Sequence, residues 1–323
     1  MINNYQCKIC DNTQGHQLVF AREMQYGFRD EFIYFKCPVC GCLQIAEVPR
    51  DMSKYYPQNY YSYVQPIQRK IGMVKYFLVN AYIHGLTILR HGPHLRYFNI
   101  STLLLLENLR NFNKKSSILD VGCGSGHLLL QMRNWGYLNL TGIDPFIERD
   151  ILYPSGVKIL KQAMSEHKDR HDFVMLHHSF EHMPDPHTAF KDINRILNDN
   201  GLLLIRIPVS DSFAFRKYQN NWYQLDAPRH FFLHTTRSIS YLAQSNGFII
   251  QNIIYDSGEM QIIASEGYCR DIKLIDIGSE KRTSSYIKKC KKFAKHLNEI
   301  NDGDQCCFIL SKFKNGSTNF RKI

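Results

Sequence analysis

Three glycines at alternate positions mark the segment that is best suited to hold a ligand. Gly122, Gly124 and Gly126 follow an apolar run that ends around Asp120, and apolar residues at helical spacing come after them. This is the pattern of a strand, a tight glycine turn and the start of a helix. Glycines suit such a turn because the backbone bends sharply and main-chain N–H groups can face a ligand with no Cβ in the way. The stretch therefore predicts a binding site for a nucleotide-like ligand.

A second acidic residue follows where the ribose of such a ligand would need it. Asp144 ends the next apolar run and is followed by Pro145, and an acid at the tip of this strand can hold two ribose hydroxyl groups. The spacing differs from that of dinucleotide-binding folds, because His127 occupies the position of their last glycine. The sequence here resembles class I S-adenosylmethionine-dependent methyltransferases, whose first motif matches Asp120 and the three glycines. The resemblance implies S-adenosylmethionine as the cofactor and Asp144 as the ribose-binding residue.

The same resemblance assigns the rest of the cofactor site. Methyltransferases of this class place the adenine near the third strand, which we expect over residues 157–160, so Gln162 and Ala163 are the predicted adenine neighbours. His177 follows the fourth predicted strand, at the edge of the sheet where open α/β folds bind ligands. The predicted cofactor-binding residues are Asp120, Gly122, Cys123, Gly124, Gly126, Asp144, Pro145, Gln162, Ala163 and His177.

Histidines follow the fourth strand and also occupy a long aromatic loop further along the chain. A hydroxyl acceptor must lose its proton as it attacks the methyl group, and an imidazole with a pKa near neutrality suits that task. His178, after the strand expected over residues 172–176, and His230, in the loop, are the predicted bases, with Glu181 or Asp226 available to orient one of them. The predicted catalytic residues are thus His178, His230 and Glu181. The chain has 14 histidines, and the alternative is that each candidate is a hydrogen-bonded structural residue.

Two Cys-x-x-Cys pairs near the N-terminus predict a metal site. Cys7 and Cys10 form one pair and Cys37 and Cys40 the other, and each pair presents two thiolates from one tight turn. The residues between the pairs can form a hairpin, with strands expected over 17–20 and 32–35. We predict a zinc ribbon in which the four cysteines close a structural zinc site, with Cys42 beside it. The alternative is two unrelated reduced pairs. Nucleic-acid binding by the ribbon is disfavoured because its charges are mixed.

The elements that position these residues alternate between strands and helices. They predict an α/β protein with a Rossmann-like, doubly wound seven-stranded sheet, a small N-terminal zinc-ribbon module and a helical linker. Strands are expected over residues 117–121, 138–143, 157–160, 172–176, 202–207, 248–255 and 306–313. The predicted domains are the ribbon (1–62), a helical linker or cap (63–113), the methyltransferase domain (114–313) and a C-terminal tail (314–323). Within the methyltransferase domain, residues 208–235 are predicted to form a substrate lid and residues 256–303 an insertion.

Composition and charge limit the partners. The chain has 40 Lys and Arg against 29 Asp and Glu, a formal net charge of +11, which favours an anionic partner such as a nucleotide, a nucleic acid or an acidic membrane surface. The N-terminal residues lack a secretory signal pattern, and the most apolar stretch, 73–89, is too short and polar to span a bilayer. We therefore expect a cytoplasmic protein whose ten cysteines are metal ligands or buried thiols. Peripheral membrane contact through the basic segment 70–89 and the oligomeric state are left open.

A further pattern narrows the class of acceptor. Trp222, Asp226, Pro228 and His230 are spaced as in enzymes that pair a zinc ribbon with this domain and that include sugar methyltransferases. This resemblance implies methyl transfer to a hydroxyl or amine of a small anionic molecule, a sugar or nucleotide-linked sugar in glycan biosynthesis. The long C-terminal domain of the C-methylating sugar enzymes is not matched. Two alternatives remain: an RNA or protein methyltransferase that grips its polymer with the ribbon, and a non-catalytic cofactor-binding protein. The intact glycine turn and Asp144 argue against the second alternative.

Overall fold

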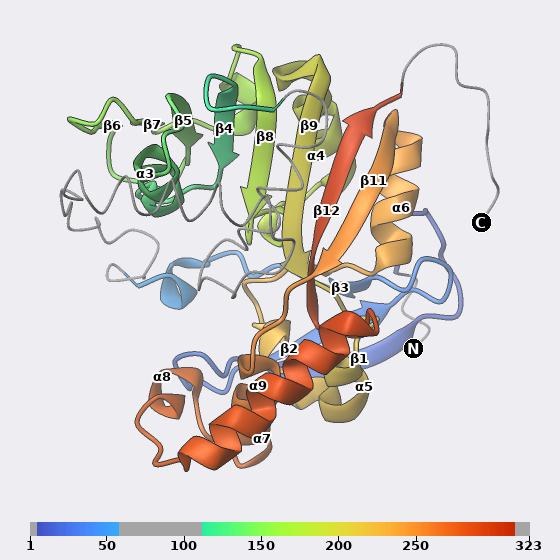
Figure 1. The fold of residues 1–323 in the computed structure, drawn as a ribbon. Coiled ribbons are helices and arrows are strands. Elements are labelled where there is room, and N and C mark those ends of the chain that lie inside the picture. The colour runs from blue at the N-terminus through green and yellow to red at the C-terminus, as the bar shows by residue number, and fades with distance from the viewer. Residues whose placement is uncertain (1–4, 58–111, 314–323) are drawn as a thin grey trace.

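The computed structural model describes residues 5–57 and 112–313. The predicted helical linker (63–113) lies outside these ranges except for residues 112 and 113. The described residues form two β-sheets with helices packed around them (Figure 1). The smaller sheet belongs mainly to the N-terminal module, and the larger sheet carries the glycine turn.

The large sheet is mixed. Its strands are β4 (Ser117–Val121), β5 (Asn139–Ile143), β6 (Ile151–Leu152), β7 (Lys158–Leu160), β8 (His171–His177), β9 (Leu197–Pro208), β11 (Phe248–Tyr255) and β12 (Gln305–Lys312). They are arranged in the order β11-β12-β9-β8-β4-β5-β7-β6. The central strands from β9 to β7 run parallel, and the strands at both edges pair antiparallel. Parallel strands bring their carboxyl ends to one edge of the sheet, so the residues that follow β4, β5 and β8 lie close together there.

The sheet has eight strands in the described part of the chain, so the predicted count of seven was wrong. The additional strand, β6, has two residues and pairs antiparallel with β7. It is too short to produce the alternation of apolar and polar residues that identifies a strand, which needs about four residues. β9 is also longer than predicted and begins at Leu197, because the chain passes from helix α4 (Pro186–Ile196) directly into the strand.

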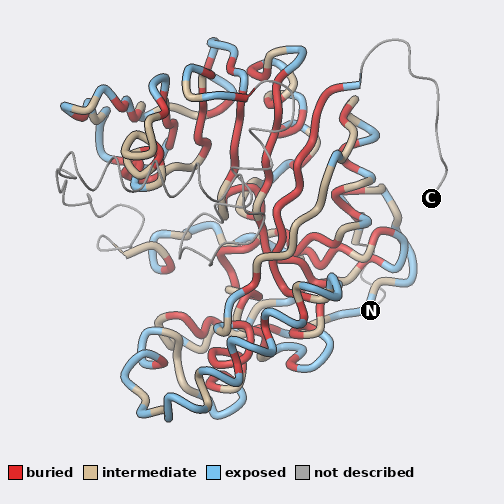
Figure 2. Tube along the Cα trace, viewed as in Figure 1, coloured by how far each residue is buried: buried red, intermediate tan, exposed pale blue. Residues whose placement is uncertain are grey.

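Helices cover both faces of the large sheet. Ile118 and Phe173 point to one face, where they pack with Leu129 of α3 (His127–Asn134). Leu119 and Val174 point to the other face, which is covered by α4 and α6 (Thr236–Ser245). Figure 2 shows the central strands buried almost throughout their length.

Helix α4 begins at an Asp-Pro pair. Asp185 accepts a hydrogen bond from the Thr188 backbone N–H at 3.0 Å, and Pro186 occupies the first helical position. Both features favour the start of a helix, because the aspartate satisfies a free N–H group and proline has none to satisfy. The Asp-Pro pair therefore sets the direction in which the chain leaves the end of β8.

The small sheet joins the N-terminal module to the rest of the chain. It has the order β1-β2-β3-β10 and is antiparallel throughout. The first three strands are β1 (Gln17–Arg22), β2 (Glu31–Lys36) and β3 (Leu43–Ile45), while β10 (Phe232–Leu233) comes from the segment predicted as a lid. In Figure 1 this sheet lies beyond the carboxyl ends of the central strands of the large sheet. The small sheet therefore lies at the edge of the large sheet where the carboxyl ends of its central strands meet.

Residues 256–303 form a helical unit that also contacts the N-terminal module. Its helices are α7 (Met260–Cys269), α8 (Leu274–Ile277) and α9 (Ser284–Glu299), and α5 (Phe213–Tyr218) packs beside α7. The Leu274 backbone N–H donates to the Met24 carbonyl at 2.8 Å. The 3-10 helices are η1 (Ser53–Tyr55), η2 (Met164–Glu166), η3 (Phe180–His182), η4 (Gln219–Asn221) and η5 (Tyr223–Leu225). None of the described helices is long and apolar enough to cross a membrane.

Candidate active site

The glycine turn between β4 and α3 takes backbone conformations that other residues rarely adopt. Gly122, Gly124 and Gly126 have φ angles of +73°, +53° and +80°. The first and third also leave no room for a side chain, since an added Cβ would lie 2.5 Å from Ser179 Cβ and 2.4 Å from Ile159 Cδ1, respectively. Glycine is therefore required by the backbone angle and by packing, and the backbone stays open to a ligand.

Asp144 lies at the end of β5, beside the glycine turn. Its Oδ2 accepts a hydrogen bond from the Gly124 N–H and its Oδ1 one from the Phe146 N–H, both at 2.9 Å. Each oxygen keeps a lone pair for a further donor, which is what two ribose hydroxyl groups require. Burial raises the pKa of Asp144, and burial with the nearby charge of Asp144 raises the pKa of Asp120 well above its usual range. Asp144 is thus better suited than Asp120 to hold a ligand as an anion.

Cys123, Pro145 and His177 border the same edge of the sheet. Cys123 rests on β5, because its Sγ would lie 2.4 Å from a Cβ added to Gly142. Burial raises the pKa of the Cys123 thiol well above its usual range, so the side chain packs as a neutral group. Pro145 is exposed next to Asp144. Burial, followed by the charge of Arg206, lowers the pKa of His177 well below its usual value, so this imidazole is neutral.

Gln162 and Ala163 follow β7, in the loop that leads to η2. The Gln162 side chain contacts His167 Nδ1 at 3.0 Å. The Ala163 backbone N–H donates to Glu166 Oε2 at 3.0 Å, which helps to begin η2. Both residues are half-buried, and their role as adenine neighbours stays a prediction.

His178 follows β8 and lies between two charged side chains. Arg206 Nη1 donates to His178 Nε2 at 2.8 Å, so this nitrogen carries a lone pair and the ring proton is on Nδ1. Nδ1 lies 3.3 Å from Glu181 Oε1. Arg206 also pairs with Asp256 at 2.7 Å. A neutral imidazole whose N–H faces a carboxylate is the arrangement of a general base with an orienting acid.

His230 lies against the same carboxylate. Its Nδ1 donates to the Gln224 carbonyl at 2.7 Å, and its Nε2 lies 3.8 Å from both Glu181 Oε1 and Asp226 Oδ2. The side chain is 7% exposed, against 31% for His178. Burial raises the pKa of Glu181, but the His178 contact and the neighbouring imidazoles outweigh it and lower the pKa to about 2. The structure thus brings all three predicted catalytic residues together around one buried, ionised carboxylate.

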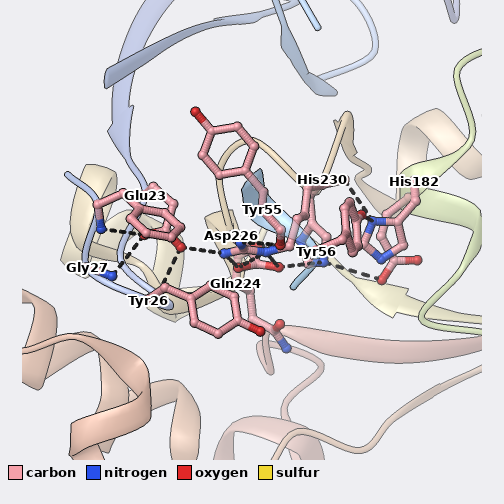
Figure 3. Close-up of polar contacts among 12 residues, drawn as sticks. Glu23, Tyr26, Gly27, Tyr55, Tyr56, His182, Gln224, Asp226 and His230 are labelled. Carbon is pink, nitrogen blue, oxygen red and sulfur yellow. Dashed lines mark hydrogen bonds and ion pairs between the residues drawn. The ribbon is translucent and has the colours of Figure 1, made fainter. Parts of the chain in front are cut away.

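Arg229 connects this group to the N-terminal module through Asp226 and Glu23, which are labelled in Figure 3. Its guanidinium is fully buried and pairs with Asp226 at 2.6 Å and with Glu23 at 3.0 Å, and it donates to the Tyr55 carbonyl at 3.2 Å. Because its donors face these internal partners, Arg229 is not placed to bind a substrate phosphate. Glu23 is held in turn by the backbone N–H groups of Tyr26, Gly27 and Phe28.

The four predicted zinc ligands meet in the N-terminal module. The Sγ atoms of Cys7, Cys10, Cys37 and Cys40 all lie within 4.8 Å of one another, with Cys7–Cys40 at 3.5 Å and Cys10–Cys37 at 3.6 Å. Zn–S bonds of about 2.3 Å place tetrahedral ligands about 3.8 Å apart, so these thiols fit a zinc ion with little movement. Burial raises the pKa of the Cys42 thiol well above its usual range, which favours a neutral side chain beside the group.

The segment predicted as a lid is bound to the ribbon and to the large sheet. Its strand β10 pairs with β3, and Thr235 Oγ1 donates to the Cys40 carbonyl at 2.7 Å. Trp222 is fully buried, and its Nε1 donates to Asp304 Oδ2 at 2.9 Å. Residues 222–235 are therefore held at both ends, and they carry His230 between these two attachments.

Comparison with known proteins identifies the domain that carries this site. Residues 93–252 match the model of a family described as a methyltransferase domain. This range includes the glycine turn, Asp144 and the residues around Glu181. The chain is a methyltransferase that carries its methyltransferase domain in this range.

Two solved structures are similar to this methyltransferase. One is the cyclopropane synthase MmaA2 of Mycobacterium tuberculosis, with 17% identity, a TM-score of 0.43, and coverage of 66% of this chain and 84% of that chain. The other is a methyltransferase of Thermotoga maritima described as a possible histamine N-methyltransferase, with 18% identity, a TM-score of 0.43, and coverage of 75% and 100%. None of the curated proteins compared with the chain matches its sequence.

Sequence reasoning missed two residues of the site. Glu23 lies in the N-terminal module, and its pairing with Arg229 depends on contacts between segments that are far apart in the chain. His182 is the other, and its position next to Glu181 on η3 places it in the same group. A Glu-His pair directly after a central strand was the signal that could have found it. In the methyltransferase, His182 Nδ1 lies 2.7 Å from the Arg229 carbonyl.

Proposed function

We propose that this methyltransferase acts on a hydroxyl or amine of a small molecule, a sugar or nucleotide-linked sugar of glycan biosynthesis. The observation that carries the proposal is the placement of His178 between Glu181 and Arg206 at the carboxyl end of β8. Ser179, the next residue, packs against Gly122 of the glycine turn. A base at this position stands beside the site where the cofactor would present its methyl group.

S-adenosylmethionine supplies an activated methyl group on its sulfonium, which the acceptor takes by in-line displacement. The chain's part is to align the acceptor, exclude water and remove its proton. His178 Nε2 would take that proton once the acceptor displaces the Arg206 N–H from its lone pair, and the carboxylate of Glu181 would stabilise the charge that then develops on the ring. His178 is the better candidate than His230, because its side chain is more exposed and an acceptor can reach it.

The residues of the cofactor half fit S-adenosylmethionine. Asp144 has an acceptor lone pair on each oxygen, and the glycine turn has no side chain at Gly122, Gly124 or Gly126 to block the ligand. Asp144 would hold the ribose, and the glycine turn would lie against the methionine part and the sugar. We place Gln162 and Ala163 near the adenine on the resemblance alone.

Zinc is the second proposed component, and its role is structural. Four thiols at tetrahedral spacing leave no open position for chemistry. The Thr235 hydroxyl donates to the Cys40 carbonyl, so a metal that fixes the second cysteine pair would also support the segment that carries His230. We also propose a cytoplasmic location, in whose reducing conditions the ten cysteines of the chain would remain thiols or metal ligands.

The surface of the ribbon favours a small acceptor over RNA. Strands β1 and β2 expose Leu18, Phe20 and Ile33, with Phe20 opposite Ile33 across the hairpin. A surface that binds nucleic acid carries clustered Lys and Arg to contact phosphates. The net charge of +11 is instead suited to a diphosphate-linked sugar in the active site.

The test is transfer of tritiated methyl groups from S-adenosylmethionine to a panel of nucleotide sugars and glycan precursors. We expect label in at least one sugar and none in RNA. Label in RNA or protein but in no sugar would overturn the proposed acceptor class. With the acceptor that is found, His178→Ala should lower kcat by about 10²- to 10⁴-fold, with little change in cofactor affinity.

The matched control is His296→Ala, which removes an exposed histidine of α9 far along the chain from the site. Its kcat should stay close to that of the unaltered enzyme. If His178→Ala and His296→Ala have the same kcat, His178 is not the base. His230→Ala then tests the remaining candidate.

A further inference from the structure

A second group of metal-ligating side chains lies at the end of β8, outside the ribbon. Glu181, His182 and His230 each offer a ligand atom, and the three atoms lie within 4.8 Å of one another. Glu181 and His182 belong to η3, whereas His230 lies in the segment that pairs with the ribbon. The group forms only when these two parts of the chain pack together (Figure 3).

Both imidazoles are held in the tautomer that a metal needs. His182 Nδ1 lies 2.7 Å from the Arg229 carbonyl, and His230 Nδ1 lies 2.7 Å from the Gln224 carbonyl. A carbonyl only accepts hydrogen bonds, so each Nδ1 carries the proton and each Nε2 keeps a lone pair. Metal-binding histidines have this arrangement, in which the second nitrogen donates to a carbonyl or carboxylate that fixes the ring.

The carboxylate of Glu181 has too few partners for its burial. The side chain is fully buried, and among the described residues neither oxygen accepts a hydrogen bond of good geometry. The nearest ring nitrogens are His178 Nδ1 at 3.3 Å and His230 Nε2 at 3.8 Å. Buried carboxylates without partners cost several kcal/mol, so a native structure normally supplies them with a cation or donors.

The local charges also favour a cation. One buried guanidinium, that of Arg229, serves two carboxylates, Glu23 and Asp226, while the carboxylates of Asp226 and Glu181 each lie 3.8 Å from His230 Nε2. Arg229 contacts the first two directly, and Glu23 also accepts three backbone N–H groups. Glu181 receives neither kind of contact in the described residues. The negative charge of Glu181 is therefore not balanced by Arg229, and it lies beside the Nε2 lone pairs of His182 and His230.

We propose that Glu181, His182 and His230 bind a divalent transition-metal ion of the zinc class. Two imidazoles and one carboxylate are a ligand set of catalytic zinc sites and of non-haem iron sites. Bonds of about 2.1 Å place tetrahedral ligands about 3.4 Å apart, and His230 Nε2 and Glu181 Oε1 are 3.8 Å apart. The three ligand atoms lie within 4.8 Å of one another, so side-chain movements of up to about 1 Å would close the site.

Three protein ligands leave a coordination position open, unlike the four cysteines of the ribbon. Ser179 links this site to the cofactor half, because it lies two residues before Glu181 and packs against Gly122. The open position would accept an oxygen or nitrogen of the acceptor, a step that rests on the proposed function. His178 then remains the base, since His230 is a ligand.

The test is the zinc content of the full-length protein after incubation with zinc and removal of loosely bound metal. We expect about two zinc ions per chain, one in each group of ligands. Glu181→Gln, which keeps the side-chain shape, and His182→Ala should each reduce the content to about one ion per chain. Cobalt in place of zinc gives a second readout, because only the cysteine site produces thiolate-to-metal absorption.

His296→Ala controls for metal held by an exposed histidine and should keep both ions. Retention of the cobalt–thiolate absorption by Glu181→Gln and His182→Ala shows that each variant is folded. The proposal is overturned if the unaltered protein holds only the cysteine-bound ion, or if both variants keep the second ion. These counts do not depend on the acceptor, so a failure of the proposed function would leave them unchanged.

Discussion

The two halves of the active site are built in different ways. The cofactor half consists of the glycine turn and Asp144, which follow the neighbouring strands β4 and β5 and are joined by the hydrogen bond from the Gly124 N–H to Asp144. The acceptor half combines Glu181 at the end of β8 with Arg229 and Glu23, which come from the lid segment and the N-terminal module. The cofactor half is therefore built from residues that are close in the sequence. The acceptor half forms only where the N-terminal module, the lid segment and the end of β8 pack together.

The difference predicts which half depends on the ribbon. The glycine turn contacts the large sheet and Ser179. His230, in contrast, lies in a segment that is attached at Trp222 on one side and at β10 on the other, and β10 pairs with β3 of the N-terminal module. Ser179 is the point where the halves meet, since its Oγ donates to the Val121 carbonyl at 2.7 Å. Damage to the ribbon should therefore disturb the acceptor half and leave cofactor binding nearly intact.

The largest effect is expected from removing the zinc ion that we propose for the N-terminal module. Cys37→Ser removes one proposed zinc ligand, and structural zinc contributes directly to the folding free energy of small modules. Amide hydrogens in residues 5–57 and 208–235 should exchange about 100-fold faster, measured by hydrogen–deuterium exchange. The affinity for S-adenosylmethionine should stay within about twofold, as expected for a distant site.

Cys269→Ser is the matched control, because Cys269 is exposed and lies outside the cysteine group. It should leave the exchange pattern unchanged. If the ribbon of Cys37→Ser loses protection while residues 208–235 keep theirs, the two segments are not one folding unit and the comparison fails.

A similar loss of stability is expected from Arg229→Met. The substitution keeps an unbranched side chain but leaves Asp226 and Glu23 buried without their guanidinium, which should cost about 3–5 kcal/mol in the free energy of unfolding. Denaturant titration measures this value. Arg216→Ala is the control in the same segment: Arg216 is 58% exposed and pairs with Asp302, and such pairs contribute about 0–1 kcal/mol. Equal losses in both variants would show that the buried network does not hold the junction.

Asp144→Ala tests the cofactor half alone. The substitution removes both oxygens proposed to accept the ribose hydroxyl groups. Because hydrogen bonds to a charged group are stronger than neutral ones, the affinity for S-adenosylmethionine should fall by about 10²- to 10³-fold. Calorimetric titration with S-adenosylmethionine measures the change, and Asp169→Ala, at an exposed acid, is the control. The zinc content and the exchange rates of residues 5–57 should not change. Near-normal affinity would remove Asp144 from the site.

The sequence predicted the cofactor half better than the acceptor half for a physical reason. The glycines, Asp144 and the strands around them are fixed by local backbone requirements and by alternating apolar residues, which a single sequence displays. The pairing of β10 with β3 and of Glu23 with Arg229 depends on packing between segments about 200 residues apart, and no local pattern encodes it. The two-residue strand β6 was missed because it is too short to have a pattern.

The cysteine cluster is an intermediate case. Its two pairs lie in different parts of the module, but each pair has a fixed spacing that reflects one tight turn, so the sequence predicts the group without predicting the sheet. The cluster of Glu181, His182 and His230 has no such spacing across its two segments. Only the adjacent pair Glu181-His182 can be recognised from the sequence.

The smallest expected effect concerns the attachment of the lid segment to β12. Burial raises the pKa of Asp304 to about 6, although the hydrogen bond from Trp222 opposes the shift. The folded state therefore holds a proton that the unfolded chain has already released, so the free energy of unfolding falls as the pH rises from about 4 to 6. Asp304→Asn removes this titration but keeps an oxygen to accept the Trp222 N–H.

The variant should show a flatter dependence of the unfolding free energy on pH between about 4 and 6. At pH 7 the free energy of unfolding of the variant should exceed that of the unaltered protein by up to about 3 kcal/mol, because a pKa raised by about two units corresponds to about 1.36 kcal/mol per unit. A weaker hydrogen bond from Trp222 to the amide would reduce this gain. Denaturant titration across this range measures both quantities. An unchanged slope would mean that Asp304 does not titrate with a raised pKa in the folded protein.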